Sequence, residues 1–135
     1  MANLDRSPHE HRCMLEVATT TAGIALDVSE YRNVIFAVAT DGGGDYNGTI
    51  KFQGTIMEDE PTWTSAKSKN NIWDYLDVIN LNGSLSIDGD TGFVLAGEDN
   101  VRLFEMNTNG VTWVNVRQTA RSAGEITVYI RAYKN

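Results

Sequence analysis

The sequence predicts an all-β protein that folds as an antiparallel β-sandwich, and three observations lead to this expectation. Short apolar segments are separated by clusters of Gly, Asn and Asp, at the spacing typical of sandwiches and barrels. Gly, Thr and Asn make up 37 of the 135 residues, a usage that favours strands and turns. The best helix candidate, residues 64–71, lacks an apolar stripe. We therefore expect a jelly-roll-like domain of about eight strands.

The N-terminus is expected to form an extended arm, residues 1–13, ahead of a sandwich domain at residues 14–135. The first twelve residues, MANLDRSPHEHR, combine a Ser-Pro step with mixed charge and few apolar side chains. Such a segment cannot bury enough surface to become ordered in isolation. From Met14 onward the pattern changes to strands and turns.

Two segments alternate cleanly between apolar and polar residues, which is typical of strands with one buried face. Residues 48–56 place Ile50, Phe52 and Ile56 on one face, and residues 126–133 repeat the pattern near the C-terminus. The remaining strand candidates are residues 14–19, 24–28, 75–80, 93–96, 101–106 and 111–119.

Residues 34–39, VIFAVA, differ because they are apolar on both faces. This pattern indicates a central strand that is covered on both sides, or one that a neighbouring subunit covers on its second side. The small side chains of Ala37 and Ala39 would permit a close approach.

Two turns suggest how the last strands are connected. Asn109-Gly110 is a hairpin dipeptide, because both residue types tolerate positive φ, and it predicts antiparallel pairing of residues 101–106 with 111–119. Ser122-Ala123-Gly124 would join the second of these strands to the last one. The C-terminal third is therefore predicted to be a three-stranded meander.

The charge of the chain argues against nucleic acid as a partner. The formal net charge is −7, whereas a broad nucleic-acid surface must neutralise phosphates. Twelve acidic and four basic residues lie between Asp41 and Glu105, whereas residues 106–135 carry four basic residues and one acidic residue. We therefore expect an acidic end that faces solvent and a basic meander that, together with the arm, faces other subunits.

The sequence gives no indication of a membrane or an oxidising compartment. No apolar run approaches the ~20 residues of a spanning helix, and the N-terminus lacks the apolar core of a signal peptide. The single cysteine, Cys13, cannot form an internal disulfide, although it leaves a link between chains open.

Two groups of residues have the chemistry of metal ligands. His9, His11 and Cys13 alternate along the arm and could offer a metal two nitrogens and a thiolate. Asp88 and Asp90 flank a glycine and could contribute to a calcium site, although the residues after Gly92 do not follow the EF-hand pattern. An incidental pair of histidines and an ordinary turn explain these residues more simply, so we expect no metal and no other cofactor, and calcium at Asp88 and Asp90 stays open.

We expect no catalytic residues and no enzymatic activity. Both histidines lie in the arm, so a nucleophile–histidine arrangement would require the arm to fold back onto the domain. The acidic run Glu58-Asp59-Glu60 is expected to be a solvated loop, since a glycosidase needs two carboxyl groups at a defined distance across a cleft. The glycines at 42–44 are not followed by a lysine that could meet a phosphate.

The aromatic residues Trp63, Trp73 and Tyr75 flank a polar loop. Such residues can stack on a sugar or anchor a subunit interface, and packing within the domain is an equal alternative for the two tryptophans. Trp113, in a predicted strand, is expected to pack in the core.

Three motifs resemble those of small β-sandwich domains in tailed-bacteriophage virion proteins. They are a GT-x-x-F-x-G strand at residues 48–54, followed by a tryptophan loop that ends at Trp63, the sequence NGVTWV at residues 109–114, and the sequence SAGEITV at residues 122–128. The likeness covers roughly residues 34–133. The chain departs from the pattern at residues 57–62, MEDEPT, where these domains often have a short Asp-Gly turn.

In size and organisation the chain is most similar to capsid decoration (cement) proteins. The resemblance implies a non-enzymatic late protein on the virion capsid surface, assembled in the host cytoplasm as a homo-oligomer, by analogy a trimer, with the major capsid protein or other virion proteins as partners. A tail, collar or fibre accessory protein and a carbohydrate-binding module are the alternatives. The residues expected to contact the capsid or another subunit are Leu4, Arg6, Arg12, Trp63, Trp73, Tyr75, Arg117, Arg121 and Arg131.

Overall fold

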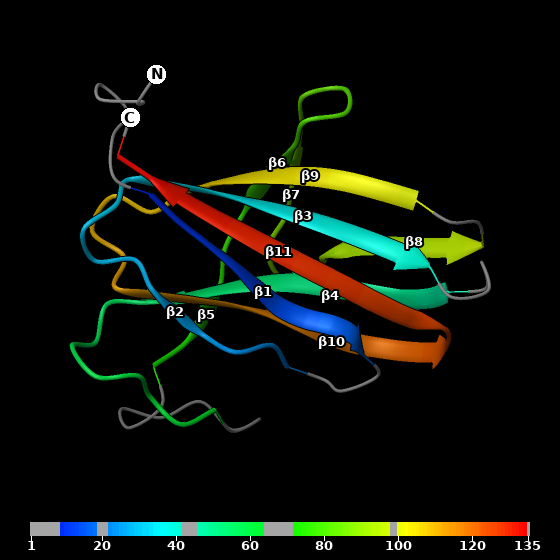
Figure 1. The fold of residues 1–135 in the computed structure, drawn as a ribbon, viewed down its shortest axis with the longest axis horizontal. Helices are drawn as coiled ribbons and strands as arrows, with labels where there is room; N and C mark the ends of the chain where they lie inside the picture. The colour runs from blue at the N-terminus through cyan, green and yellow to red at the C-terminus, as the bar shows by residue number, and fades with distance from the viewer. Residues whose placement is uncertain (1–8, 19–21, 42–45, 64–71, 98–99, 135) are drawn as a thin grey trace, which may run out of the picture.

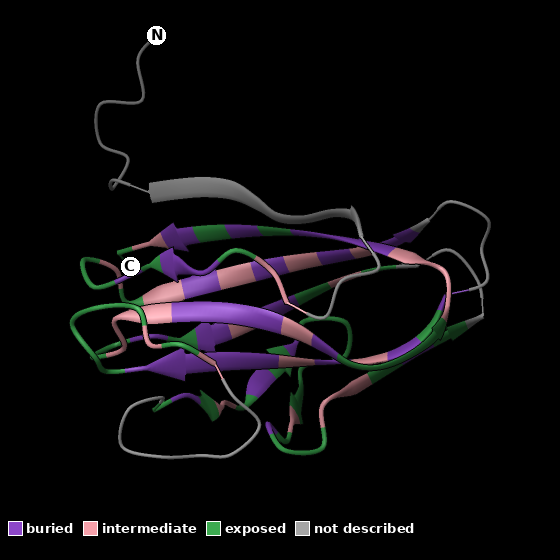
Figure 2. Cartoon of the chain, turned by 90° about the horizontal axis from the view of Figure 1, so that it is seen from below, coloured by how far each residue is buried: buried purple, intermediate pink, exposed green. Residues whose placement is uncertain are grey.

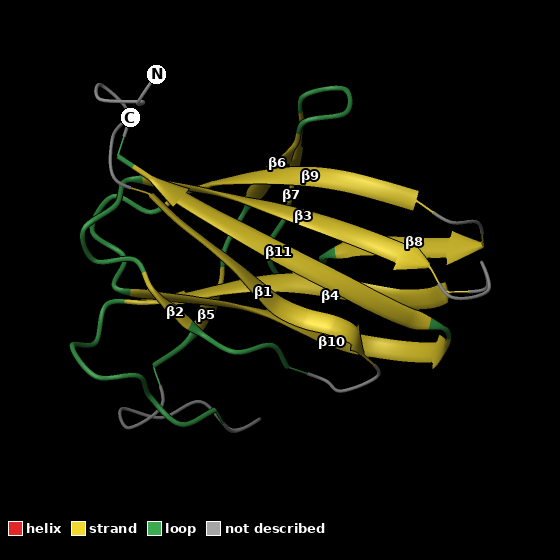
Figure 3. Cartoon of the chain, viewed as in Figure 1, coloured by secondary structure: helices red, strands yellow, loops and turns green. Residues whose placement is uncertain are grey.

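The computed structural model describes residues 9–18, 22–41, 46–63, 72–97 and 100–134, and for residues 9–18, 41, 97 and 100 it describes the backbone alone. It confirms an all-β fold of two antiparallel sheets packed face to face (Figures 1 and 3). The larger sheet, in spatial order, consists of β1 (His9–Ala18), β11 (Glu125–Tyr133), β3 (Asn33–Asp41), β9 (Asn100–Asn107), β6 (Val78–Asn80) and β7 (Leu85–Ile87). The smaller sheet consists of β2 (Leu26–Asp27), β10 (Trp113–Ala123), β4 (Tyr46–Thr55) and β5 (Asp74–Tyr75), with β8 (Phe93–Gly97) also paired to β4.

The core lies between the sheets and is built from the alternating residues of the long strands. In β3, Val34, Phe36 and Val38 are completely buried, and in β11 the even-numbered residues from Ile126 to Ala132 are buried as well. Figure 2 shows this alternation as bands of buried and less buried residues along the strands. The rings of Phe36 and Phe104 in the larger sheet lie 4.6 Å and 5.1 Å from that of Phe52 in the smaller one. The predicted alternation in β4 and β11 is therefore the pattern that forms the core, except at Ile56, which follows the end of β4 and is 72% exposed.

The chain changes sheet at every connection except β4–β5 and β6–β7. This topology contradicts the hairpin predicted at Asn109-Gly110, since β9 pairs with β3 and β6 whereas β10 pairs with β4 and β2. The reason is the type of turn. The Val111 N–H donates to the Thr108 carbonyl, and Gly110 has φ of 92° while Asn109 is not in the positive-φ region. A turn with positive φ at its third position alone is of type II, which does not match the twist of a hairpin.

The predicted C-terminal meander is also wrong, because β10 and β11 lie in different sheets. The chain crosses between them at Gly124, which has φ of 83° and lies against the backbone of Tyr46. A Cβ atom at Gly124 would lie 2.4 Å from the Tyr46 Cα, so only glycine fits this crossing.

The strand count also differs from the expectation of about eight, since the described residues contain eleven. The segment 75–80 is divided between β5 and β6, which belong to opposite sheets, and β7 was not predicted. β1 begins at His9, five residues before the predicted strand, and pairs with β11. The jelly-roll arrangement stays a prediction.

Among the described residues, no helix is long and apolar enough to cross a membrane.

Candidate binding surface on the smaller sheet

The outer face of the smaller sheet gathers polar and aromatic residues from three strands. Lys51, Gln53 and Thr55 of β4 point away from the core and pair in register with the residues Arg117, Asn115 and Trp113 of β10. On the other side of β4, Gln53 pairs with Tyr75 of β5. Strand alternation thus places two cations, an amide and an aromatic ring side by side.

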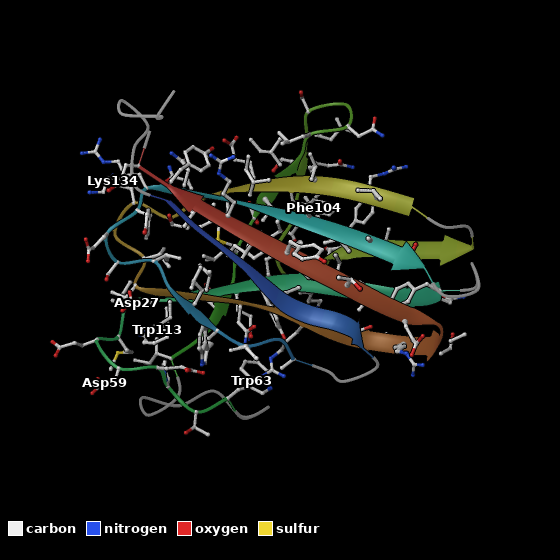
Figure 4. The ribbon with its side chains drawn as sticks, in the orientation of Figure 1. Asp27, Asp59, Trp63, Phe104, Trp113 and Lys134 are labelled. Atoms are coloured by element: carbon white, nitrogen blue, oxygen red, sulfur yellow. The ribbon has the colours of Figure 1, made fainter. Side chains whose placement is uncertain are left out.

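Trp63 completes this group from the loop after β4. The Arg117 guanidinium lies 4.2 Å from the centre of the Trp63 ring, and the Lys51 ammonium lies 4.9 Å from that of Tyr75. The two rings are 5.9 Å apart and tilted by 58°. We refer to Lys51, Gln53, Trp63, Tyr75 and Arg117 as the aromatic–cationic cluster. Figure 4 shows Trp63 on the side of the smaller sheet, away from the core residue Phe104.

Gln53 is the most unusual member of the cluster, because it is buried and only one of its two polar side-chain atoms has a hydrogen-bond partner. Its Oε1 accepts a hydrogen bond of 2.9 Å from the Arg117 Nε, while its Nε2 has no partner and its side chain is 1% exposed. Burial also lowers the pKa of Arg117, with the nearby Tyr75 acting in the opposite direction. A buried amide donor without an acceptor costs about 1–3 kcal/mol, so the cluster holds hydrogen-bonding capacity that the described chain does not use.

The loop after β4 is fixed over this face by hydrogen bonds to its carbonyl groups. The Trp73 indole, 3% exposed, donates to the Pro61 carbonyl at 2.9 Å. The Trp113 indole donates to Glu58 at 3.1 Å, and the Thr112 hydroxyl donates to Met57. Trp113 therefore packs on the outside of the smaller sheet rather than in the core, as Figure 4 shows. Trp73 is a packing residue of this loop.

The cluster has the chemistry of a small polar binding surface. The aromatic rings offer flat apolar area, and the two cations are hydrogen-bond donors. Ligands rich in oxygen acceptors, such as sugars or carboxylates, match this combination. Sequence reasoning singled out Trp63, Tyr75 and Arg117 but missed Lys51 and Gln53. The alternation of residues 48–56 placed both of them on the outer face, and that signal could have found them.

The other predicted contact residues do not join this cluster. Arg121 is exposed near the end of β10, and its Nε donates to the Gly124 carbonyl at 2.6 Å. Arg131 is exposed on the outer face of the larger sheet. Leu4 and Arg6 lie outside the described residues, as does the side chain of Arg12. Because Arg117 and Arg131 lie on opposite outer faces, the predicted basic meander does not form one surface.

The acidic residues considered for calcium form an ordinary turn. The Asp88 carboxylate accepts hydrogen bonds from the Thr91 hydroxyl at 2.9 Å and from the Thr91 N–H at 3.0 Å, and these bonds lower its pKa. The Gly89 N–H donates to Asp77. Within the part of the chain that the structure describes, no three His, Cys, Asp or Glu residues are grouped to hold a metal. The side chains of His9, His11 and Cys13 lie outside that part. Glu58, Asp59 and Glu60 lie in an exposed loop, as expected.

Comparison with known proteins yields a likeness of fold. No family model matches the sequence, and no curated protein matches it. Among solved structures, the chain is similar to the crystal structure of the SPBc2 prophage-derived protein YomS, with a TM-score of 0.67. The match covers 93% of this chain and 92% of that chain, with 13% sequence identity. The two proteins therefore share a sandwich over nearly their whole lengths.

Proposed function

We propose that this protein is a non-enzymatic structural protein of a bacteriophage virion, which binds the outer surface of the head and stabilises it. The observation that carries this proposal is the likeness of fold to a prophage-derived protein along nearly the whole chain. The motifs at residues 48–54, 109–114 and 122–128, which resemble phage virion domains, add to it. Fold alone does not establish function, so the location in the particle is the point to test.

The described residues support a role in binding rather than in chemistry. Their unusual features are surfaces: the aromatic–cationic cluster on one outer face and, on the other, exposed apolar side chains that include Leu103 and Tyr129. A protein that coats a shell in many copies can use such surfaces, because repeated weak contacts add up through avidity.

The test is cryo-electron microscopy of two samples of purified particles. One sample comes from cells that carry the gene for this protein, and the other comes from cells in which the gene is deleted. The expected result is additional density at regular positions on the head that is lost in the deletion. Density confined to the tail would contradict head binding and support the tail, collar or fibre alternative. Absence of the protein from purified particles would refute the virion role.

Carbohydrate binding is the second candidate, and the aromatic–cationic cluster favours it. The Trp63 and Tyr75 rings could engage a sugar through stacking, and Lys51 and Arg117 could donate hydrogen bonds to it. Binding on a glycan array that is lost in Trp63→Ala, but retained in the exposed control Leu85→Ala, would support it. The absence of any binding by the wild-type protein would contradict it.

A further inference from the structure

The outer face of the larger sheet carries apolar side chains that the described chain leaves exposed. Four strands contribute to it in the order β11, β3, β9 and β6. Tyr129, Leu103, Val101 and Ile79 are between 40% and 63% exposed, and the small residues Ala37 and Ala39 lie between them. No described segment crosses the front of β11, β3 and β9 in Figure 1. An exposed apolar patch of this kind marks an interaction surface.

The charged residues of this face lie on opposite sides of the apolar centre. One row across the four strands consists of Arg131, Ile35, Glu105 and Ile79, as the register of the sheet defines it. Arg131 is exposed at the β11 side. At the β6 side an open hollow of about 430 Å³, large enough for a guanidinium group, is lined by Asp77, Ile79, Glu105 and neighbouring polar residues. The hollow thus offers two carboxylates, while the opposite side of the same row offers a guanidinium.

We propose that a second copy of this chain covers this face, in a two-fold pair in which Arg131 of each copy enters the acidic hollow of the other. A two-fold axis parallel to the strands, between β3 and β9, would bring β11 of one copy over β6 of the other. The row then faces its own reverse, so that Arg131 lies opposite Ile79, at the hollow that Asp77 and Glu105 line. In the neighbouring row, Ala37 of each copy lies opposite Leu103 of the other. Such self-complementarity is the requirement of an isologous interface.

A second copy fits this face better than an unrelated partner, because the same face carries both a base, Arg131, and the acids, Asp77 and Glu105, that it would meet. The alanines of β3 at the centre allow the two sheets to approach closely, as face-to-face sheet packing requires. Aromatic residues and arginine are enriched in interfaces, and Tyr129 and Arg131 supply both on this face. The pair is two-fold, whereas the resemblance to decoration proteins implies a trimer. The inference goes beyond the proposed virion role and does not depend on it.

The test is sedimentation equilibrium of the full chain with two single charge reversals, Arg131→Glu and Glu105→Arg. Each variant alone sets like charges against one another across the interface. We expect the wild type to sediment at twice the mass of the 14.9 kDa chain, and each variant to dissociate about tenfold or more readily. Mixing the two variants restores both opposite-charge contacts. The mixture should therefore regain the dimer.

Controls separate this result from misfolding. Asp59→Arg reverses an exposed charge on the loop over the opposite face and should leave the dimer unchanged. Leu103→Asp, at the apolar centre, should abolish the dimer, with thermal unfolding confirming that the chain is folded. Glu105→Arg loses the hydrogen bond from Tyr133 and could fail to fold for that reason. In that case Glu105→Gln replaces it, and both Glu105→Gln and Arg131→Glu should dissociate more readily than the wild type. A monomeric wild type, a trimer, or a mixture that stays monomeric would overturn the inference.

Discussion

The two outer faces of the sandwich differ in how their side chains are covered. The part of the smaller sheet around Arg117 is covered by its own chain, because the loop after β4 brings Trp63 onto Arg117 and is held by the indoles of Trp73 and Trp113. The larger sheet leaves Leu103 and Tyr129 at least 40% exposed. One face is therefore completed within the chain, and the other has the composition of a surface that is completed by another molecule.

This difference shows that strand alternation alone does not determine whether the outer face of a sheet is covered or exposed. Both sheets contribute buried residues at every second position to the same core. The outer positions of β4 and β10 are polar apart from Trp113, and a loop packs on them whose carbonyl groups accept hydrogen bonds from the indoles of Trp73 and Trp113. The outer positions of β3 and β9 are mainly apolar, as the sequence VIFAVA already indicated.

The largest effect is expected from removal of the loop's buried anchor. Trp73→Ala should lower the free energy of unfolding by about 3–5 kcal/mol, because it leaves a cavity and frees the loop that covers the smaller sheet. Leu103→Ala on the other face should change it by about 0.5 kcal/mol or less when measured at low protein concentration. Urea denaturation of both variants checks this. An equal loss of unfolding free energy in the two variants would contradict the contrast between the two outer faces.

Alkaline pH distinguishes a tyrosine of the core from one on the uncovered face. Burial raises the pKa of Tyr46 to about 12, while Arg121 acts against this, and the Tyr46 hydroxyl donates to Gln118 at 2.6 Å. Burial and the hydrogen bond to Glu105 raise the pKa of Tyr133 to about 12 as well. Both values exceed that of an unfolded tyrosine, about 10, so the stabilisation is present below pH 10 and is lost as the pH rises through 12.

The expected loss from Tyr46 alone is about 2–3 kcal/mol across this interval. Tyr46→Phe should therefore show a weaker pH dependence of the free energy of unfolding than the wild type between pH 10 and 12. Tyr133→Phe should change the dependence less, because that hydroxyl lies on the partly exposed outer face. An unchanged slope in Tyr46→Phe would show that the phenol does not carry the alkaline sensitivity.

A smaller effect separates the two arginines that sequence reasoning grouped together. Arg117→Met removes the contact with Trp63 and leaves both polar atoms of Gln53 unpaired, so stability should fall by about 1–2 kcal/mol. Arg131→Met should cost less than about 0.5 kcal/mol in the monomer. Thermal unfolding of the two variants at low protein concentration measures this difference. A larger loss for Arg131→Met would contradict the assignment of the two faces.

The sequence predicted the fold class because strand alternation depends on local spacing, which residues 48–56 and 126–133 display. It did not predict the connections, because Asn109-Gly110 is compatible with several turn types, and contacts such as that of Gly124 with Tyr46 select one. In the same way, Trp63, Tyr75 and Arg117 were singled out by residue type. The orphaned Gln53 amide depends on burial by distant residues, which local patterns do not encode.

The central claim is that one outer face is covered within the chain and the other by a second copy. Hydroxyl-radical footprinting of the wild-type protein at low and high concentration tests it most directly. We predict that oxidation of Leu103 and Tyr129 falls as the concentration rises, whereas oxidation of Trp63 and Trp73 stays the same. Oxidation of Leu103 and Tyr129 that is independent of concentration would contradict the account.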